Sequence, residues 1–317
     1  MKFQKILMLG YADGDLREEH WKRIDKLCAE KVMLPKDSPE IAKHLSTCDC
    51  LLLKLGMRAD RDTIDHAPNL KYIGMFGTGV GNIDIKYAAK KGITVCNLYY
   101  ATEAVAELAF GVLIEHLRDL ERAKAQARTG DYSESTYFDT SEIRGKAFGV
   151  IGLGRIGGRV AEIAKYGFDA DVRYWSKNRK KKYEAKGIRY QQVDTLLKEC
   201  DFLSLNLSHV QGETTDFLNA ERIARIKPGA IVVNLSPNEL VNMDALENRL
   251  SKNDIMYILD HSDELTKDDA SRLAKYKNCI MYPPIGYTTR EASSVKKTIF
   301  VENLENFLKG KPTNKVN

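Results

Sequence analysis

The sequence predicts an α/β protein made of an open parallel-sheet domain, a second parallel-sheet domain and a terminal helix. Two observations lead to this fold class. Short apolar runs alternate with amphipathic stretches along the chain, a pattern typical of parallel strands joined by crossover helices. A glycine-rich segment at 150–160 lies between an apolar run and a helical pattern, and it reads Gly-x-Gly-x-x-Gly.

The expected strands fall into two runs, separated by a long helical segment. The first run comprises 5–9, 50–53, 72–76 and 94–97, with amphipathic helices at 18–29 and 83–91. A helix is expected from 103 to about 127, and an irregular polar segment follows at 129–144. The second run comprises 147–151, 171–175, 202–205, 230–234, 256–260 and 279–281, and a last helix covers 290–308.

Three glycines after residue 151 indicate a dinucleotide site. Gly152 permits a tight turn from strand to helix, and Gly154 lets the backbone approach a pyrophosphate. Gly157 lets the helix pack closely on the strand, with the diphosphate at the positive end of that helix. The strand-like run before the glycines and the helical pattern after them favour this interpretation over a merely glycine-rich turn.

The composition is that of a globular protein long enough for two domains. Of 317 residues, 43% are hydrophobic and 29% are charged. The net charge is +5, but the sequence does not indicate a broad basic face with aromatic residues. This argues against nucleic acid as a partner. The apolar runs are too short for a signal-peptide core or a membrane span, so we expect a cytoplasmic protein with no membrane partner.

The cysteines are scattered and lie mostly in apolar surroundings. Only Cys48 and Cys50 are close in sequence, and no cluster of His or Cys accompanies them. We therefore expect buried, reduced thiols and no metal site. The six residues are Cys28, Cys48, Cys50, Cys96, Cys200 and Cys279.

Further motifs, spread over nearly the whole chain, resemble the D-isomer-specific 2-hydroxyacid dehydrogenases, the family of glyoxylate and hydroxypyruvate reductases and phosphoglycerate dehydrogenase. The first half contains Asn-Leu-Lys-Tyr-Ile at 69–73, Gly-Thr-Gly-Val-Gly-Asn-Ile-Asp at 77–84 and Gly-Ile-Thr-Val-Cys-Asn at 92–97. The second half contains Val-Ala-Glu-Leu at 105–108, Arg-Gly-Lys at 144–146 and Lys-Pro-Gly-Ala at 227–230. Residues 303–317 resemble the family's terminal helix and tail.

This resemblance implies two Rossmann-like, doubly wound parallel-sheet domains with the active site in the inter-domain cleft. It places a substrate-side, flavodoxin-like domain at 1–99 plus 288–317 and a dinucleotide-binding Rossmann domain at 100–287. It also implies a homodimer, to which the long helix after Asn97 contributes, and a small-molecule substrate that is anionic.

The resemblance also assigns binding residues. Arg155 and Ile156 contact the pyrophosphate beside the three glycines, and Asp260 holds the nicotinamide carboxamide. In the first domain, the backbone amides around Thr78 and Gly79 bind the substrate carboxylate. The other residues along the cofactor are Thr102, Leu207, Thr214 and Ser236.

The segment after the second strand of the cofactor domain favours NADP(H) over NAD(H). An acidic residue there would bind the ribose 2′-hydroxyl of NAD, but Ser176 occupies this position and no carboxylate follows directly. Lys177 and Arg179 accompany it, and cations beside a hydroxyl suit a 2′-phosphate because charge-assisted hydrogen bonds to phosphate are strong. The alternative is a solvated, lysine-rich loop, with NAD(H) as the other cofactor.

Both of the family's essential cationic groups are replaced by proline. The family holds the substrate carboxylate with an arginine and protonates the developing alkoxide with a histidine that a glutamate tunes. Pro237 stands in the arginine's position and Pro284 in the histidine's, while the glutamate's position falls on Leu265, next to Glu264. Because proline has neither an ionisable group nor a side-chain donor, the family's usual mechanism cannot operate.

Other side chains are candidates for the missing roles. Lys54 follows a first-domain strand and can hold a carboxylate or donate a proton, unless it is simply a solvated cation at a strand end. Tyr99 and Tyr100 lie where a phenol can act as an acid or only pack. His261 is a displaced-acid candidate, although its side chain is expected to point away from that of its neighbour in a continuing strand. The candidate catalytic residues are Lys54, Tyr100 and Glu264, and the candidate substrate-binding residues are Lys54, Thr78 and Gly79.

Three hypotheses follow. The first is an NAD(P)-dependent oxidoreductase with a remodelled catalytic centre, acting on something other than a standard 2-oxoacid. The second is a non-catalytic cofactor-binding homologue that works as a sensor or scaffold. The third, an ordinary 2-hydroxyacid dehydrogenase with substitute residues, is disfavoured by the two prolines. A retained cofactor site does not separate the first two.

Overall fold

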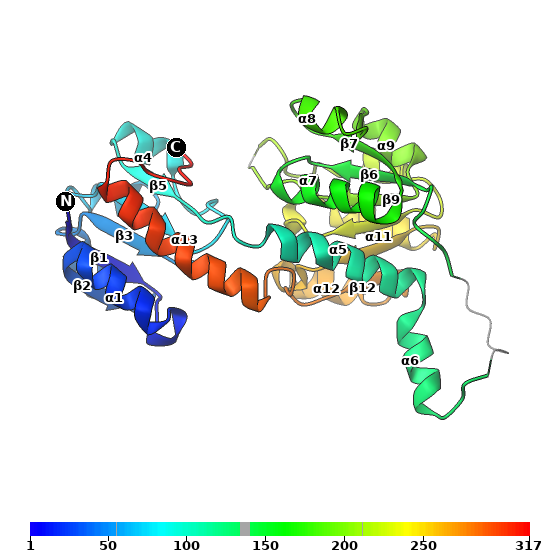
Figure 1. The fold of residues 1–317 in the computed structure, drawn as a ribbon, viewed down its shortest axis with the longest axis horizontal. Helices are drawn as coiled ribbons and strands as arrows, with labels where there is room; N and C mark the ends of the chain where they lie inside the picture. The colour runs from blue at the N-terminus through cyan, green and yellow to red at the C-terminus, as the bar shows by residue number, and fades with distance from the viewer. Residues whose placement is uncertain (55, 134–139, 211) are drawn as a thin grey trace. The chain divides into compact units, whose positions relative to one another are not determined.

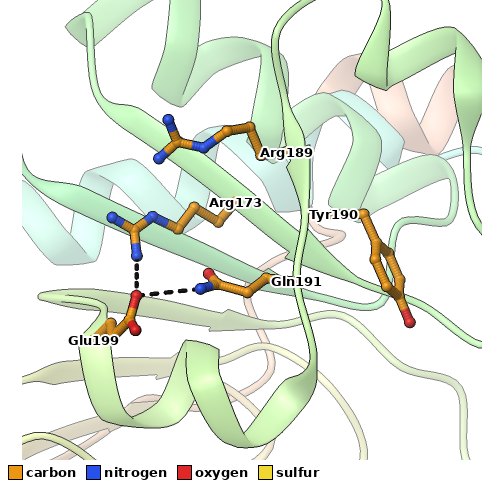
Figure 2. Close-up of a pocket in the computed structure, with 5 residues that line it drawn as sticks. All are labelled: Arg173, Arg189, Tyr190, Gln191 and Glu199. Atoms are coloured by element: carbon orange, nitrogen blue, oxygen red, sulfur yellow. Dashed lines mark hydrogen bonds and ion pairs between the residues drawn. The ribbon is translucent and has the colours of Figure 1, made fainter.

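The computed structural model describes residues 1–54, 56–133, 140–210 and 212–317 and divides the chain into two compact units. Unit 1 consists of Met1–Ala101 and Thr289–Asn317, and unit 2 consists of Thr102–Thr288. Each unit is built on one parallel sheet accompanied by helices (Figure 1). The predicted α/β class with two Rossmann-like parallel sheets is confirmed.

Unit 1 holds a five-stranded sheet in the order β2-β1-β3-β4-β5. Because the strand order reverses between β1 and β3, the sheet has the flavodoxin-like topology, whose ligands bind where the order reverses. Its strands are β1 (Phe3–Leu9), β2 (Cys28–Leu34), β3 (Cys50–Leu53), β4 (Tyr72–Met75) and β5 (Thr94–Cys96). Its helices are η1 (Asp13–Asp15), α1 (Glu18–Leu27), α2 (Ile41–Leu45), α3 (Arg61–Asp65), α4 (Ile85–Lys90) and α13 (Arg290–Leu308).

Unit 2 holds a seven-stranded sheet in the order β12-β11-β10-β9-β6-β7-β8, so its strand order reverses between β6 and β9. The strands are β6 (Ala147–Ile151), β7 (Asp171–Trp175), β8 (Arg189–Tyr190), β9 (Phe202–Leu205), β10 (Ile231–Asn234), β11 (Met256–Leu259) and β12 (Cys279–Met281). The helices are α5 (Thr102–Leu117), α6 (Leu120–Arg128), α7 (Arg155–Glu162), α8 (Lys181–Glu184), α9 (Val193–Glu199), α10 (Ala220–Ala224), α11 (Met243–Leu250) and α12 (Lys267–Leu273). Short turns of helix, η2 (Ile163–Gly167), η3 (Asn238–Leu240) and η4 (Ser262–Glu264), complete the unit.

The central strands carry the core of each unit. Every residue of β3, β4, β9 and β10 is buried, as expected for parallel strands covered on both faces. All six cysteines are buried free thiols. Desolvation raises the pKa of Cys48, Cys200 and Cys279 to about 12. Within the described ranges, no group of three or more His, Cys, Asp or Glu side chains is arranged to hold a metal ion, and no helix is long and apolar enough to span a bilayer.

Several elements differ from the sequence-based expectation. The helix expected at 18–29 ends at Leu27, and the chain passes directly into β2, a strand that was not predicted. The short edge strand β8 was also missed. The single helix expected at 103–127 is wrong, because Asp119 adopts the left-handed conformation (φ 48°) and separates α5 from α6. Residues 134–139 of the expected irregular segment lie outside the described residues.

Candidate functional site

The turn between β6 and α7 can be built only with glycine at two positions. Gly152 has φ +95°, and a Cβ there would lie 2.6 Å from the carbonyl oxygen of Asn206. A Cβ on Gly157 would lie 1.9 Å from the carbonyl oxygen of Gly152. The first glycine therefore makes the tight turn, and Gly157 brings α7 onto the strand, as the fingerprint requires.

The middle glycine borders open space. Gly154 is the N-cap residue of α7, and a Cβ placed on it would meet no other heavy atom within 4 Å. The following N–H groups lack intrahelical acceptors, and the helix dipole adds positive potential, which suits a diphosphate. The turn also follows β6, where the strand order reverses. These residues fit the pyrophosphate of a dinucleotide, with Arg155 and Ile156 on the first turn of α7.

The residues expected at the cofactor's 2′-position lie after β7, and each has a partner within the protein. The buried Ser176 hydroxyl donates to the carbonyl of Asn178 (2.7 Å). Lys177 Nζ lies 2.7 Å from Glu213 Oε2, and Arg179 binds Glu184 with both Nε and Nη2. Both cations are largely exposed, at 77% and 64%, so these ion pairs are weak and a phosphate can compete for them.

The hydroxyls expected along the cofactor bind backbone groups at the end of β9 and in the loop that follows it. Thr214 Oγ1 accepts from the N–H of Val210 (2.7 Å) and donates to the carbonyl of Ser208 (3.0 Å). Ser236 Oγ donates to the carbonyl of Leu205 (2.8 Å). These bonds fix the loops at the carboxyl edge of the sheet. The half-buried Leu207 packs on the core of unit 2, and Thr102 begins α5.

Asp260 follows β11 and is almost fully buried, at 2% exposure. Its Oδ1 accepts from the N–H of Ile285 (2.9 Å) and its Oδ2 from the N–H of Gly286 (3.1 Å). A Cβ on Gly286 would lie only 2.8 Å from Oδ2, so glycine is needed for this approach. The aspartate therefore fixes the backbone that follows Pro284.

The loop of Pro237 is joined to the loop after β11. Asn238 Nδ2 donates to the carbonyl of His261 (2.5 Å), and its backbone N–H donates to Glu264 Oε2 (3.4 Å). Glu264 Oε1 also lies 3.5 Å from His261 Nδ1. Burial raises the pKa of the Glu264 carboxyl. The alternation expected of a continuing strand does not apply to His261, because β11 ends at Leu259.

The candidate residues of unit 1 lie at the carboxyl edge of its sheet. Lys54, directly after β3, places Nζ 2.9 and 3.0 Å from the two carboxylate oxygens of Asp15, which lies in η1 after β1. Thr78 Oγ1 donates to the carbonyl of Leu98 (2.9 Å), while Gly79 is exposed. Tyr100 packs against an aromatic and aliphatic cluster of unit 1.

Lys296 was not singled out from the sequence. It lies on α13, and its Nζ is 4.1 Å from the ring centroid of Phe76 and 5.1 Å from that of Tyr100. Its position in the middle of a mixed polar helix offers no local signal, since only the tertiary fold brings it to the end of β4.

Comparison with known proteins gives the family. Residues 110–286 match the sequence model described as "D-isomer specific 2-hydroxyacid dehydrogenase, NAD binding domain". A glyoxylate reductase from Thermococcus litoralis is 34% identical over 297 residues, covering 89% of this chain and 88% of the relative. The chain belongs to the D-isomer-specific 2-hydroxyacid dehydrogenase family. It therefore shares the fold and NAD-binding domain of a family of oxidoreductases.

Solved structures agree with this assignment. An acyclic imino acid reductase in complex with NADPH and D-arginine is 27% identical, with a TM-score of 0.86 over 99% of this chain and 100% of the other. A D-lactate dehydrogenase from Aquifex aeolicus, in complex with NAD and lactic acid, has a TM-score of 0.83 over 96% of each chain. At 24% identity, the second likeness concerns the fold alone.

Proposed function

We propose that this protein is an NADP(H)-dependent reductase with a remodelled catalytic centre, acting on a protonated imine of a carboxylate-bearing small molecule. The observation that carries the proposal is the pair of prolines, Pro237 and Pro284, at the positions of the family's arginine and histidine. The loops that hold these prolines are fixed by internal hydrogen bonds, so the changes replace side chains within an ordered frame.

The chemistry of the acceptor explains how reduction can proceed without the two lost groups. When a carbonyl is reduced, its oxygen becomes an alkoxide that an acid must protonate. A protonated imine already carries the positive charge on nitrogen. Addition of a hydride to its carbon moves the C=N π electrons to nitrogen and leaves a neutral amine, which takes its proton from water. Neither a histidine acid nor an arginine that polarises an oxygen is needed.

The proposal divides the roles between the two units. Unit 2, which corresponds to the dinucleotide-binding domain expected at 100–287, binds the dinucleotide through the fingerprint glycines. The nicotinamide, when bound, would supply the hydride. Asp260 binds the carboxamide and shapes the adjoining loop. Unit 1 (1–99 plus 288–317) binds the substrate carboxylate through the amides around Thr78 and Gly79 and through Lys54. Tyr100 and Glu264 are the remaining candidate proton carriers, and the pKa of Glu264, raised by burial, suits proton exchange with the substrate nitrogen.

Similarity to one relative supports both an imine as the substrate and NADPH as the cofactor. The 27%-identical structure is an acyclic imino acid reductase that holds NADPH and D-arginine. The 34%-identical relative is a glyoxylate reductase, so family similarity by itself favours neither acceptor. The two prolines favour the imine. We also expect a homodimer in the cytoplasm, as the family resemblance implies.

The preference for NADP(H) rests on Ser176, Lys177 and Arg179. No carboxylate follows β7 directly, and both cations are largely exposed, so a 2′-phosphate can compete with their carboxylate partners. The double variant Lys177→Ala/Arg179→Ala should raise the Kd for NADPH by roughly 10- to 100-fold and leave that for NADH nearly unchanged. The control Lys182→Ala removes an exposed cation of the same run. An equal loss of both cofactors would contradict the preference.

The deciding experiment records NADPH absorbance with glyoxylate, hydroxypyruvate and the 2-oxo analogue of arginine, each with and without ammonium. We expect oxidation that requires ammonium and saturates with it, with an amino acid as the product detected by mass spectrometry. Prompt oxidation of a 2-oxoacid without ammonium would overturn the proposal. Tight NADPH binding without turnover of any substrate would favour the non-catalytic sensor or scaffold.

A further inference from the structure

Lys296 is a half-buried cation without an anionic partner. Its Nζ lies over the rings of Phe76 and Tyr100. Among the described residues, no carboxylate or carbonyl oxygen forms a hydrogen bond or ion pair with it. Burial lowers the pKa of the Lys296 ammonium, and the positive charge of Lys54 lowers it further. Two aromatic faces compensate only part of the lost hydration of an ammonium.

A second ammonium lies in the same region of unit 1. Lys54 follows β3 and Asp15 follows β1, the two neighbouring strands between which the strand order reverses. Open α/β sheets bind ligands at the carboxyl ends of strands at such a reversal. Asp15 forms its ion pair with Lys54, and its negative charge offsets only part of the lowering of the Lys296 pKa. The side chains of Lys54 and Asp15 are 33% and 21% exposed, so solvent reaches them. The three charges sum to +1.

From this arrangement we infer that Lys296 and Lys54 together form the cationic site that binds the substrate carboxylate. The inference rests on the proposed function, which requires a carboxylate-bearing substrate, and it adds a residue that the sequence did not indicate. The cation that binds the carboxylate is then supplied by α13 of unit 1.

The surroundings suit a carboxylate. A bound carboxylate gives Lys296 the acceptor it lacks, and Lys54 has one N–H donor beyond the two that bind Asp15. The rings of Phe76 and Tyr100 form an apolar wall that lowers the local dielectric constant and strengthens the attraction. Lysine binds a carboxylate as a point charge. The site can therefore accept a substrate whose reacting group is not a 2-oxo group.

The test measures binding of oxamate to the NADPH-saturated protein by calorimetry, with oxamide as a probe of similar size that lacks the carboxylate. We expect wild type to bind oxamate but not oxamide. Lys296→Gln and Lys54→Gln should each weaken oxamate binding by roughly 10- to 100-fold, and Lys296→Arg should restore most of it. Lys297→Gln is the matched control, because it removes the same charge from the adjacent position of α13.

Two results would overturn the inference: no oxamate binding to wild type, or equal binding by wild type and Lys296→Gln. Circular dichroism and the Tm of each variant establish that it is folded, and Lys296→Met provides a second neutral variant. In turnover assays, Lys296→Gln should raise KM much more than it lowers kcat. Oxamate binding that depends on Lys296 without any imine reduction would refute the proposed function and leave the carboxylate site standing.

Discussion

The carboxylate of Asp260 accepts a hydrogen bond from the backbone N–H of Gly286, at 3.1 Å from Oδ2. Its other oxygen accepts from the N–H of Ile285 at 2.9 Å. A buried side chain at the end of one strand thus fixes the loop after the next strand, and this loop contains Pro284. The backbone around Pro284, where we propose that the family's histidine has been replaced, is therefore held in place.

Asp260→Asn should destabilise the protein. The amide has only one oxygen, so either the part-buried N–H of Ile285 or the buried N–H of Gly286 loses its acceptor and faces an NH2 group instead. Leaving a buried donor unsatisfied costs about 1–3 kcal/mol. Urea unfolding of wild type and variant measures this loss. The exposed Asp263→Asn is the charge-matched control, and an Asp260→Asn variant no less stable than that control would contradict the role of Asp260.

Restoring both family residues should restore carbonyl reduction. The double variant Pro237→Arg/Pro284→His supplies a cation and an acid on two loops that internal hydrogen bonds hold in place, with Glu264 next to the expected glutamate position. We expect kcat/KM for glyoxylate without ammonium to rise by about 100-fold or more, the usual contribution of a positioned general acid. Pro237→Arg/Pro284→Gln is the control, since glutamine cannot act as an acid. A folded, NADPH-binding double variant with unchanged activity would show that something other than the two prolines limits carbonyl reduction.

Gly154 and Gly157 should respond differently to alanine. Gly157→Ala puts a methyl group against the carbonyl of Gly152, and overpacking of this kind costs about 1–3 kcal/mol or more of unfolding free energy. Gly154→Ala meets open space, so stability should fall by less than about 1 kcal/mol. The new methyl group nevertheless occupies the approach to the helix N-terminus and should weaken NADPH binding. Chemical unfolding and fluorescence titration separate these effects, and a Gly154→Ala variant with unchanged NADPH affinity would argue against a pyrophosphate there.

The hydrogen bond between Tyr282 and Glu115 should make stability depend on pH. The Tyr282 hydroxyl donates to Glu115 Oε2 (2.6 Å) and lowers the pKa of this carboxyl below its usual 4.5. A lowered carboxyl pKa contributes stability above the unfolded-state value, and this contribution is lost as the pH falls through the folded-state value. Tyr282→Phe should therefore lower the Tm at pH 7, and its difference from wild type should shrink below pH 4.5. A difference that stays constant down to pH 3 would contradict the assignment.

The strands of this protein could be predicted largely from the sequence, because apolar runs mark parallel strands covered on both faces. β3, β6, β7, β9 and β12 coincide with their expected ranges. β2 was missed for a physical reason. It follows α1 without a turn residue, and as an edge strand it carries exposed Glu30 and half-buried Lys31, so neither continuous apolarity nor a boundary marks it.

The candidate site, too, could be predicted only in part from the sequence. The glycine fingerprint follows from local geometry, so sequence spacing indicates it directly. Partners that approach from distant segments have no local signal. Glu213 pairs with Lys177 from 36 residues away, and Asp15 pairs with Lys54 from 39 residues away. Lys296 reaches the end of β4 only through the packing of the last helix.

Because the cysteines are buried, slow labelling of their thiols can report the opening of each unit separately. A thiol with a pKa of about 12 is almost entirely protonated at neutral pH, and only the thiolate attacks an alkylating reagent. Cys48 belongs to unit 1, whereas Cys200 and Cys279 belong to unit 2. Under slow labelling, each residue records how often its own unit opens. Mass spectrometry of the labelled peptides then compares the opening of the two units within one unmodified chain.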